Sequence, residues 1–212
     1  MHYQIEIKEA TQLLKTHFGI QGKLTALPGE IDLNFKVDTV QGASFVLKIA
    51  PPQVPLSYLD FQQKLLAHLK QYNAPKLIKD KKGRALVAFQ DKNGIQYRMR
   101  LLTWISGRVW SSVNPYTDAL RFDLGENCGA LCKQLETFDH PYAHRNFEWD
   151  IAQSIWVEDH LDLFDNDQKR IIKSNINAFK DFQPNYQNLR KSVIHNDAND
   201  NNIIVSEELK FP

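Results

Sequence analysis

The sequence predicts an α+β protein of two lobes, and three observations carry this prediction. Runs rich in β-branched and aromatic residues gather in residues 1–102, helical periodicity dominates residues 103–188, and a polar loop lies between two short apolar runs near the end. The periodicity changes near Leu102 to Gly107, so we expect the lobe boundary there. The expected domains are an N-terminal lobe (1–102) with an antiparallel sheet plus helix, and a hinge followed by a partial, mainly helical C-terminal lobe that ends just after the polar loop (103–212).

The N-terminal lobe is expected to hold two helices and five strands. Apolar residues at helical spacing predict a helix over Ile5 to Phe18, and Gly19 is placed to end it. The run Asp91 to Gly94 contains an Asn-Gly pair, which favours the tight turn of a hairpin. The other expected elements are the strands Lys23–Leu27, Ile31–Val40, Ala43–Ala50, Ala85–Phe89 and Ile95–Leu102, and a helix over Ser57–Tyr72.

The C-terminal lobe is expected to be helical as far as about Asn188. Leucines and cysteines at helical spacing from Leu120 to Leu135 mark a long helix. Two short β-like runs, Ser192 to Ile194 and Ile203 to Val205, then flank a polar loop, a place where catalytic residues are often mounted. The apolar residues expected to face inward are Ile155, Ile171, Ile172, Ile176, Phe179 and Phe182.

The composition is that of an ordinary soluble globular protein. Lys and Arg total 26 against 25 Asp and Glu, so the net charge is +1 and no broad positive field favours nucleic acid. No apolar run approaches the roughly 18–20 residues of a membrane-spanning helix, and Met1 to Glu6 lacks the pattern of a signal peptide. We therefore expect a cytoplasmic protein in which Cys128 and Cys132 form a reduced core pair and no metal site.

The polar loop carries the pattern His195-x-Asp197-x4-Asn202. This is the spacing of a phosphotransfer catalytic loop, in which a carboxylate orients the substrate hydroxyl and an amide five residues later binds magnesium. Lys48 lies on the third expected strand, just before a helix, as a lysine that contacts nucleotide phosphates would. Such short patterns recur by chance, so the order of the elements around them carries the prediction.

The chain resembles a known family in three runs, Leu27 to Phe35, Val46 to Ala50, and Val193 to Asn202. The family is that of the aminoglycoside phosphotransferases and choline kinase-like small-molecule kinases, and the similarity extends over essentially the whole chain. Within it, the chain looks most like hydroxylysine kinase-like proteins and the kinase-like domains fused to class III aminotransferases. The resemblance implies a protein-kinase-like bilobal fold with a nucleotide in the cleft.

The resemblance also implies roles for single residues. Lys48 would bind the α- and β-phosphates, with Asn34 as a further nucleotide-binding residue. Leu102 and Trp104 would lie in the hinge beside the base. The residues implied in transfer are Asp197 as the catalytic base and Asn202 as a magnesium ligand.

The reaction implied by the resemblance transfers the γ-phosphoryl group of Mg-ATP or Mg-GTP to a small-molecule hydroxyl. The acceptor would be an amino-bearing alcohol of the hydroxylysine, aminoglycoside, choline, ethanolamine or homoserine type. We expect no nucleic-acid or membrane partner. The choice between ATP and GTP, the acceptor, the oligomeric state and any further catalytic domains stay open at this point.

The chain departs from the family pattern in three places. The turn at Pro28 to Asp32 is not a glycine-rich phosphate loop. Gln62 stands where the family's helix would offer a glutamate to pair with Lys48, so Lys48 lacks the ionic partner that the resemblance implies. The chain also ends at Pro212, before the family's second metal-binding aspartate, so we expect it to be a fragment.

Two other interpretations use the same loop. Asp197, Asn199 and Asn201, followed by Glu208 at position twelve, nearly fit a calcium loop of the EF-hand type, although Asn202 replaces the usual glycine. Alternatively, the cluster is an Asx-rich turn within a non-catalytic, pseudokinase-like binding module.

The isolated chain of 212 residues is expected to transfer no phosphoryl group at a detectable rate, because the second metal-binding aspartate is missing. The measurement is release of ADP or GDP in the presence of amino alcohols. Detectable transfer would contradict the prediction. Reading the encoding frame beyond Pro212 separates the interpretations: an Asp-Phe-Gly-Asp-like run supports the kinase, and a stop codon supports the binding module or the calcium loop.

Overall fold

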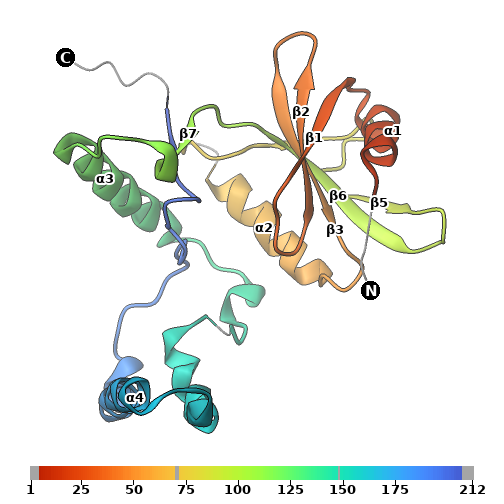
Figure 1. Ribbon diagram of the computed structural model, residues 1–212. Coiled ribbons are helices and arrows are strands. Elements are labelled where there is room, and N and C mark those ends of the chain that lie inside the picture. Colours follow the sequence, from red (N-terminus) through yellow and green to blue (C-terminus); the bar gives the residue numbers. More distant parts are fainter. Residues whose placement is uncertain (1–4, 70–71, 148, 207–212) are drawn as a thin grey trace. The chain divides into compact units, whose positions relative to one another are not determined.

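The computed structural model describes residues 5–69, 72–147 and 149–206. The chain divides into two compact units, one formed by Met1–Phe138 with Ile194–Pro212 and the other by Asp139–Val193. The first unit contains the antiparallel sheet, and the second is helical (Figure 1). The fold is therefore α+β, as expected.

The sheet has six antiparallel strands in the order β1-β2-β3-β6-β4, with β5 also paired to β6. The five strands predicted for the N-terminal lobe are all present, and the two-residue strand β4 is an addition. Their bounds are β1 Gly22–Leu27, β2 Leu33–Thr39, β3 Ser44–Ala50, β4 Leu77–Ile78, β5 Val87–Gln90 and β6 Gln96–Thr103.

Two glycines close the predicted hairpins. Gly42 (φ +83°) turns the chain between β2 and β3, and Gly94 (φ +77°) turns it between β5 and β6. Both φ angles lie in the left-handed region that glycine adopts without steric cost. In the second turn, Asp91 Oδ1 accepts hydrogen bonds from the backbone N–H groups of Asn93 (2.9 Å) and Ile95 (2.8 Å).

One face of the sheet is apolar and packs against helix α1 (Ile7–Phe18). Because side chains alternate along a strand, the buried residues Phe35 and Val37 of β2 share this face with Leu47 and Ile49 of β3. The residues between them point to the opposite face, which is the polar one. The sheet thus separates the apolar core from the face that carries Lys48.

Helix α2 (Leu56–His68) follows Pro55, which begins it at the expected place. It ends four residues earlier than predicted. Leu59 and Phe61 are buried, and the Phe61 ring lies 5.9 Å from that of Phe138.

The segment after the sheet contains β7 (Arg108–Val109), the 3-10 turn η1 (Trp110–Ser112) and α3 (Asp118–Leu135). β7 pairs with β8 (Ile204–Val205). The run from Ser192 to Ile194, which we expected to be a strand, is not one, because β8 takes β7 as its partner.

The two cysteines lie on α3 and are free, as expected, but they are not a core pair. Cys128 is half-buried and Cys132 is exposed. The buried residues of this helix are Leu120 and Leu135 at its ends.

The second unit consists of η2 (Pro141–His144), η3 (Ile151–Leu163) and α4 (Asn166–Tyr186). Helix α4 begins with a reciprocal cap, in which Asp165 and Gln168 each accept a backbone hydrogen bond from the other. Ile176 is buried, as expected for an inward residue. Ile171 and Phe182 are exposed, contrary to expectation, because no described element of this unit covers that part of α4.

No helix among the described residues is both long enough and apolar enough to cross a membrane.

The Gly107→Ala variant is expected to destabilise the β7–β8 pair by about 1–3 kcal/mol. Gly107 has φ +146°, and an added Cβ would collide with the Val205 carbonyl oxygen, which belongs to the backbone and cannot move aside. The measurement is hydrogen exchange at the amides of Ile204 and Val205.

Gly125→Ala is the matched control for this variant. An added Cβ at Gly125 meets nothing within 4 Å, and alanine is favoured over glycine inside a helix. This control is expected to leave exchange at β8 unchanged. Equal protection of β8 in the Gly107 variant and in the wild type would contradict the prediction.

Candidate active site

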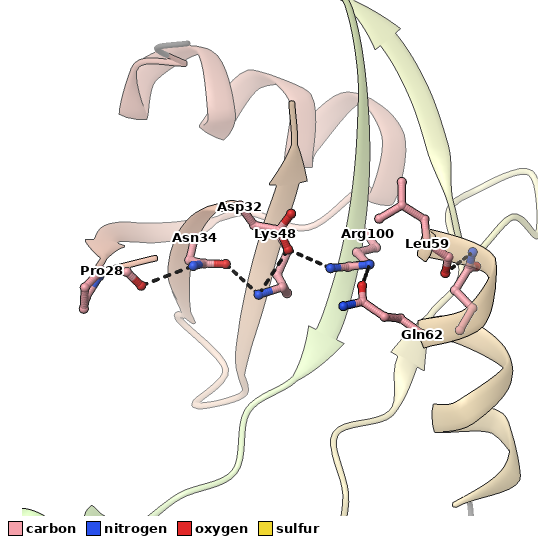
Figure 2. Close-up of polar contacts among 8 residues, drawn as sticks. Pro28, Asp32, Asn34, Lys48, Leu59, Gln62 and Arg100 are labelled. Carbon is pink, nitrogen blue, oxygen red and sulfur yellow. Dashed lines mark hydrogen bonds and ion pairs between the residues drawn. The ribbon is translucent and has the colours of Figure 1, made fainter. Parts of the chain in front are cut away.

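Three side chains form a row across the polar face of the sheet. Asn34 of β2 is the register partner of Lys48 in β3, and Lys48 is the register partner of Arg100 in β6 (Figure 2). Residues directly opposite on neighbouring antiparallel strands have side chains on the same face. The pairing register alone therefore places an amide, an ammonium group and a guanidinium group side by side.

Asp32, in the turn before β2, supplies the negative charge of this cluster. Its Oδ2 atom lies 3.3 Å from Lys48 Nζ and 2.6 Å from Arg100 Nη2. Lys48 Nζ also donates a hydrogen bond of 2.8 Å to Asn34 Oδ1. The Asn34 amide is fixed from its other side, because its Nδ2 donates to the Pro28 carbonyl (3.2 Å).

Lys48 lacks the helix glutamate that the family pattern implies, as expected, but it has a different ionic partner. The partner comes from the turn before β2 rather than from helix α2, since Asp32 pairs with Lys48. Gln62 of α2 instead accepts a hydrogen bond from Arg100 Nη1 through its Oε1 atom. The helix thus contributes a neutral acceptor to the cluster, and the turn contributes the carboxylate.

Burial lowers the pKa of the Lys48 ammonium group, and the positive charge of Arg100 acts in the same direction. Asp32 opposes both effects through its charge and its hydrogen bond. The cluster holds two cations against one carboxylate, so it keeps a net positive charge at the polar face of the sheet.

The predicted hinge residues, Leu102 and Trp104, lie at the end of β6 and directly after it. Leu102 of β6 is buried, and its register partner is Val46 of β3. Trp104 is half-buried, and its backbone N–H donates to the Ser44 carbonyl (3.2 Å). The Lys36 ammonium group lies 4.8 Å from the centre of the Trp104 ring, a cation–π distance.

The polar loop brings Asp197 and Asn202 together. Asn202 Nδ2 donates to Asp197 Oδ2 (2.6 Å) and to the Asp197 carbonyl (3.0 Å), and Asn199 Nδ2 donates to Asp197 Oδ1 (2.7 Å). Each carboxylate oxygen therefore holds one amide N–H. Because the Asn202 nitrogen faces the carboxylate, its amide oxygen is directed away from Asp197.

This loop is held in place from the segment that follows the sheet. Ser111 donates its backbone N–H to the Asp200 carbonyl (3.0 Å) and its hydroxyl to Asn201 Oδ1 (2.9 Å). The Trp110 N–H donates to the Ile203 carbonyl (2.9 Å). Asn196 has φ +62°, the left-handed conformation that asparagine tolerates better than most residues.

The predicted site residues therefore form two groups. Asn34 and Lys48 are in contact with each other, and so are Asp197 and Asn202. Within residues 5–69, 72–147 and 149–206, no hydrogen bond or ion pair joins one group to the other. Glu208, the last ligand of the alternative calcium loop, lies outside the described residues.

Sequence reasoning missed Asp32, Arg100 and Ser111. A usable signal existed for Arg100, because it is a charged residue between the apolar residues of a strand, where an unpaired charge is costly. Ser111 carried no signal, since its role depends on a contact with a residue 90 positions away.

Residues 23–211 match the model of the phosphotransferase enzyme family. The chain belongs to this family. The match includes both groups of the candidate site, since it contains Lys48 as well as the Asp197 loop.

Two curated relatives are named hydroxylysine kinase. The chain is 24% identical over 214 residues to the one from Danio rerio and 26% identical over 219 residues to the one from Xenopus laevis. Each match covers 94% of this chain but only 60% and 58% of the two relatives, respectively. The chain thus spans about three fifths of the length of the curated relatives it matches.

Two solved structures share the fold at 16% identity. An amicoumacin kinase in complex with AMP-PNP, Ca²⁺ and Ami aligns with a TM-score of 0.60 over 89% of this chain and 55% of its own. A microcompartment-associated aminopropanol kinase aligns with a TM-score of 0.53 over 68% of this chain and 45% of its own. The fold is therefore that of the protein-kinase-like small-molecule kinases.

Proposed function

We propose that these residues form the nucleotide-binding and catalytic-loop part of a small-molecule kinase. The reaction would transfer the γ-phosphoryl group of Mg-ATP or Mg-GTP to the hydroxyl of an amino-bearing alcohol. The observation that carries the proposal is the Asp197 carboxylate, which two amide groups hold in one orientation. Phosphoryl transfer depends on such positioning more than on covalent chemistry of the protein.

Asp197 is the proposed base that accepts or orients the proton of the acceptor hydroxyl. Each of its oxygens accepts one amide N–H and keeps a second lone pair for a substrate. Asn202 would hold Mg²⁺ through its amide oxygen, a hard ligand of the kind that this ion prefers. Bound there, the ion would neutralise charge on the phosphates.

Lys48 is the proposed contact to the α- and β-phosphates, with Asn34 beside it. The two cations and one carboxylate of the cluster leave a positive charge that favours an anion. Leu102 and Trp104 are proposed to lie beside the base. We also propose that the boundary between the two lobes lies near residues 102–107 and that the protein is cytoplasmic.

The proposed acceptor is a small amino alcohol. The curated relatives are named for hydroxylysine and one structural neighbour for aminopropanol, both of which carry an amine and a hydroxyl. A complex of the other neighbour contains AMP-PNP and Ca²⁺, in keeping with a metal-nucleotide donor.

The Lys48→Ala variant is expected to weaken binding of Mg-ADP by about tenfold or more, since it removes a charged contact to the phosphates. The measurement is calorimetric titration of the 212-residue chain. Lys64→Ala is the matched control, because Lys64 is an exposed lysine of α2 whose partner is Asp60. Equal affinity in the Lys48 variant and the wild type would contradict the phosphate role.

The Asp197→Asn variant of the intact protein is expected to lower kcat by orders of magnitude while folding is kept, because an amide cannot accept the hydroxyl proton. The measurement is turnover with ATP and GTP against a panel of amino alcohols. Asp123→Asn, a change at an exposed residue of α3, is the control. Normal turnover in the Asp197 variant would remove the central claim, and nucleotide binding without any transfer would favour the binding module.

A further inference from the structure

A continuous path of side-chain contacts connects helix α2 with Lys48. Gln62 Oε1 accepts from Arg100 Nη1, Arg100 Nη2 reaches Asp32 Oδ2 at 2.6 Å, and the same Oδ2 atom lies 3.3 Å from Lys48 Nζ (Figure 2). The path crosses a helix, the strand β6, a turn and the strand β3. Lys48 is therefore not placed by its own strand alone.

Arg100 is the most buried charged member of this path. Its side chain is 5% exposed, against 11% for Asp32 and 29% for Lys48. A charge so deeply buried is stable only when it is paired and hydrogen-bonded. The two cations share one oxygen of one carboxylate, so the position of Asp32 Oδ2 is fixed by Arg100 and in turn sets the position of Lys48 Nζ.

The guanidinium group suits this task better than an ammonium group would. It is planar, and it presents N–H groups in fixed directions. One nitrogen serves the carboxylate of Asp32 while the other serves the amide of Gln62. A lysine at this position has a single nitrogen and cannot span both acceptors in one fixed geometry.

We infer that Arg100 is a positioning residue for the nucleotide site, which holds Asp32 so that Lys48 points toward the phosphates and which couples Lys48 to helix α2 through Gln62. The inference rests on the proposed function only in assigning Lys48 to the phosphates. The inference adds to the proposed function the groups that keep Lys48 in place, which are Arg100, Asp32 and Gln62.

The test compares Mg-ADP with adenosine in calorimetric titrations of the 212-residue chain. Adenosine lacks phosphates, so a change that acts through Lys48 should spare it. In Arg100→Lys and Arg100→Gln, we expect the affinity for Mg-ADP to fall about tenfold, the usual size of one lost charged hydrogen bond. The affinity for adenosine should stay within about twofold.

Arg84→Gln is the control for a merely structural effect. Arg84 pairs with Asp80, whose side chain is 1% exposed, so this change also breaks an ion pair to a buried carboxylate. Asp80 lies outside the contact path to Lys48, and the control should leave the ratio of the two affinities unchanged. Equal losses for Mg-ADP and adenosine in the Arg100 variants would overturn the inference.

A second measurement decides the inference without any ligand. The side-chain NMR signals of Lys48 in isotope-labelled, ligand-free protein, assigned with the Lys48→Arg variant, should shift in Arg100→Lys. They should shift also in Gln62→Ala, a milder change that keeps every charge of the cluster. Arg84→Gln should leave them in place.

The two proposals fail in different ways. If the wild-type chain binds neither Mg-ADP nor adenosine, the nucleotide site of the proposed function fails, and the Lys48 signals still decide the role of Arg100. If the chain binds Mg-ADP and the Lys48 signals are the same in the Arg100 and Gln62 variants as in the wild type, the positioning role is overturned.

Discussion

The carboxylate of Asp32 is the contact on which the arrangement of the polar face depends. Two cations from different strands converge on one of its oxygens, and neither has another anionic partner among the described residues. Without that carboxylate, the two positive charges would lie side by side with no anion between them, because Lys48 of β3 and Arg100 of β6 are register partners. The turn at residues 28–32 therefore contributes the carboxylate of Asp32 to this face, as well as the Pro28 carbonyl that holds Asn34.

Much of the N-terminal lobe could be predicted from the sequence because its signals are local. Apolar spacing and Gly19 located α1, and Gly42 and Gly94 located two hairpins. The two-residue strand β4 escaped prediction, since so short a run has no periodicity of its own. The strand expected at Ser192 to Ile194 was wrong for a related reason: apolar composition suggests a strand, but pairing with a partner forms it.

In the candidate site too, contacts between residues close in sequence could be predicted and contacts between distant residues could not. The loop from Asp197 to Asn202 is built from contacts two to five residues apart, so its spacing was readable in the sequence. The partner of Lys48 could not be predicted from the sequence, because Asp32 and Lys48 are 16 positions apart in the chain. The family pattern places the partner on the helix instead, at the position of Gln62. Only the strand register shows that Arg100 lies beside Lys48.

The pairing of β7 with β8 has a consequence for how the chain folds. Hairpins join β1 to β2, β2 to β3 and β5 to β6, whereas Arg108 of β7 and Val205 of β8 are 97 positions apart in the sequence. Closing so long a loop costs more chain entropy than closing a hairpin, and this cost is met before the pairing returns any free energy. Both groups of the candidate site depend on such distant contacts, since Arg100 and Asp32 beside Lys48 are 68 positions apart and Ser111 and Asn201 at the aspartate loop are 90 apart.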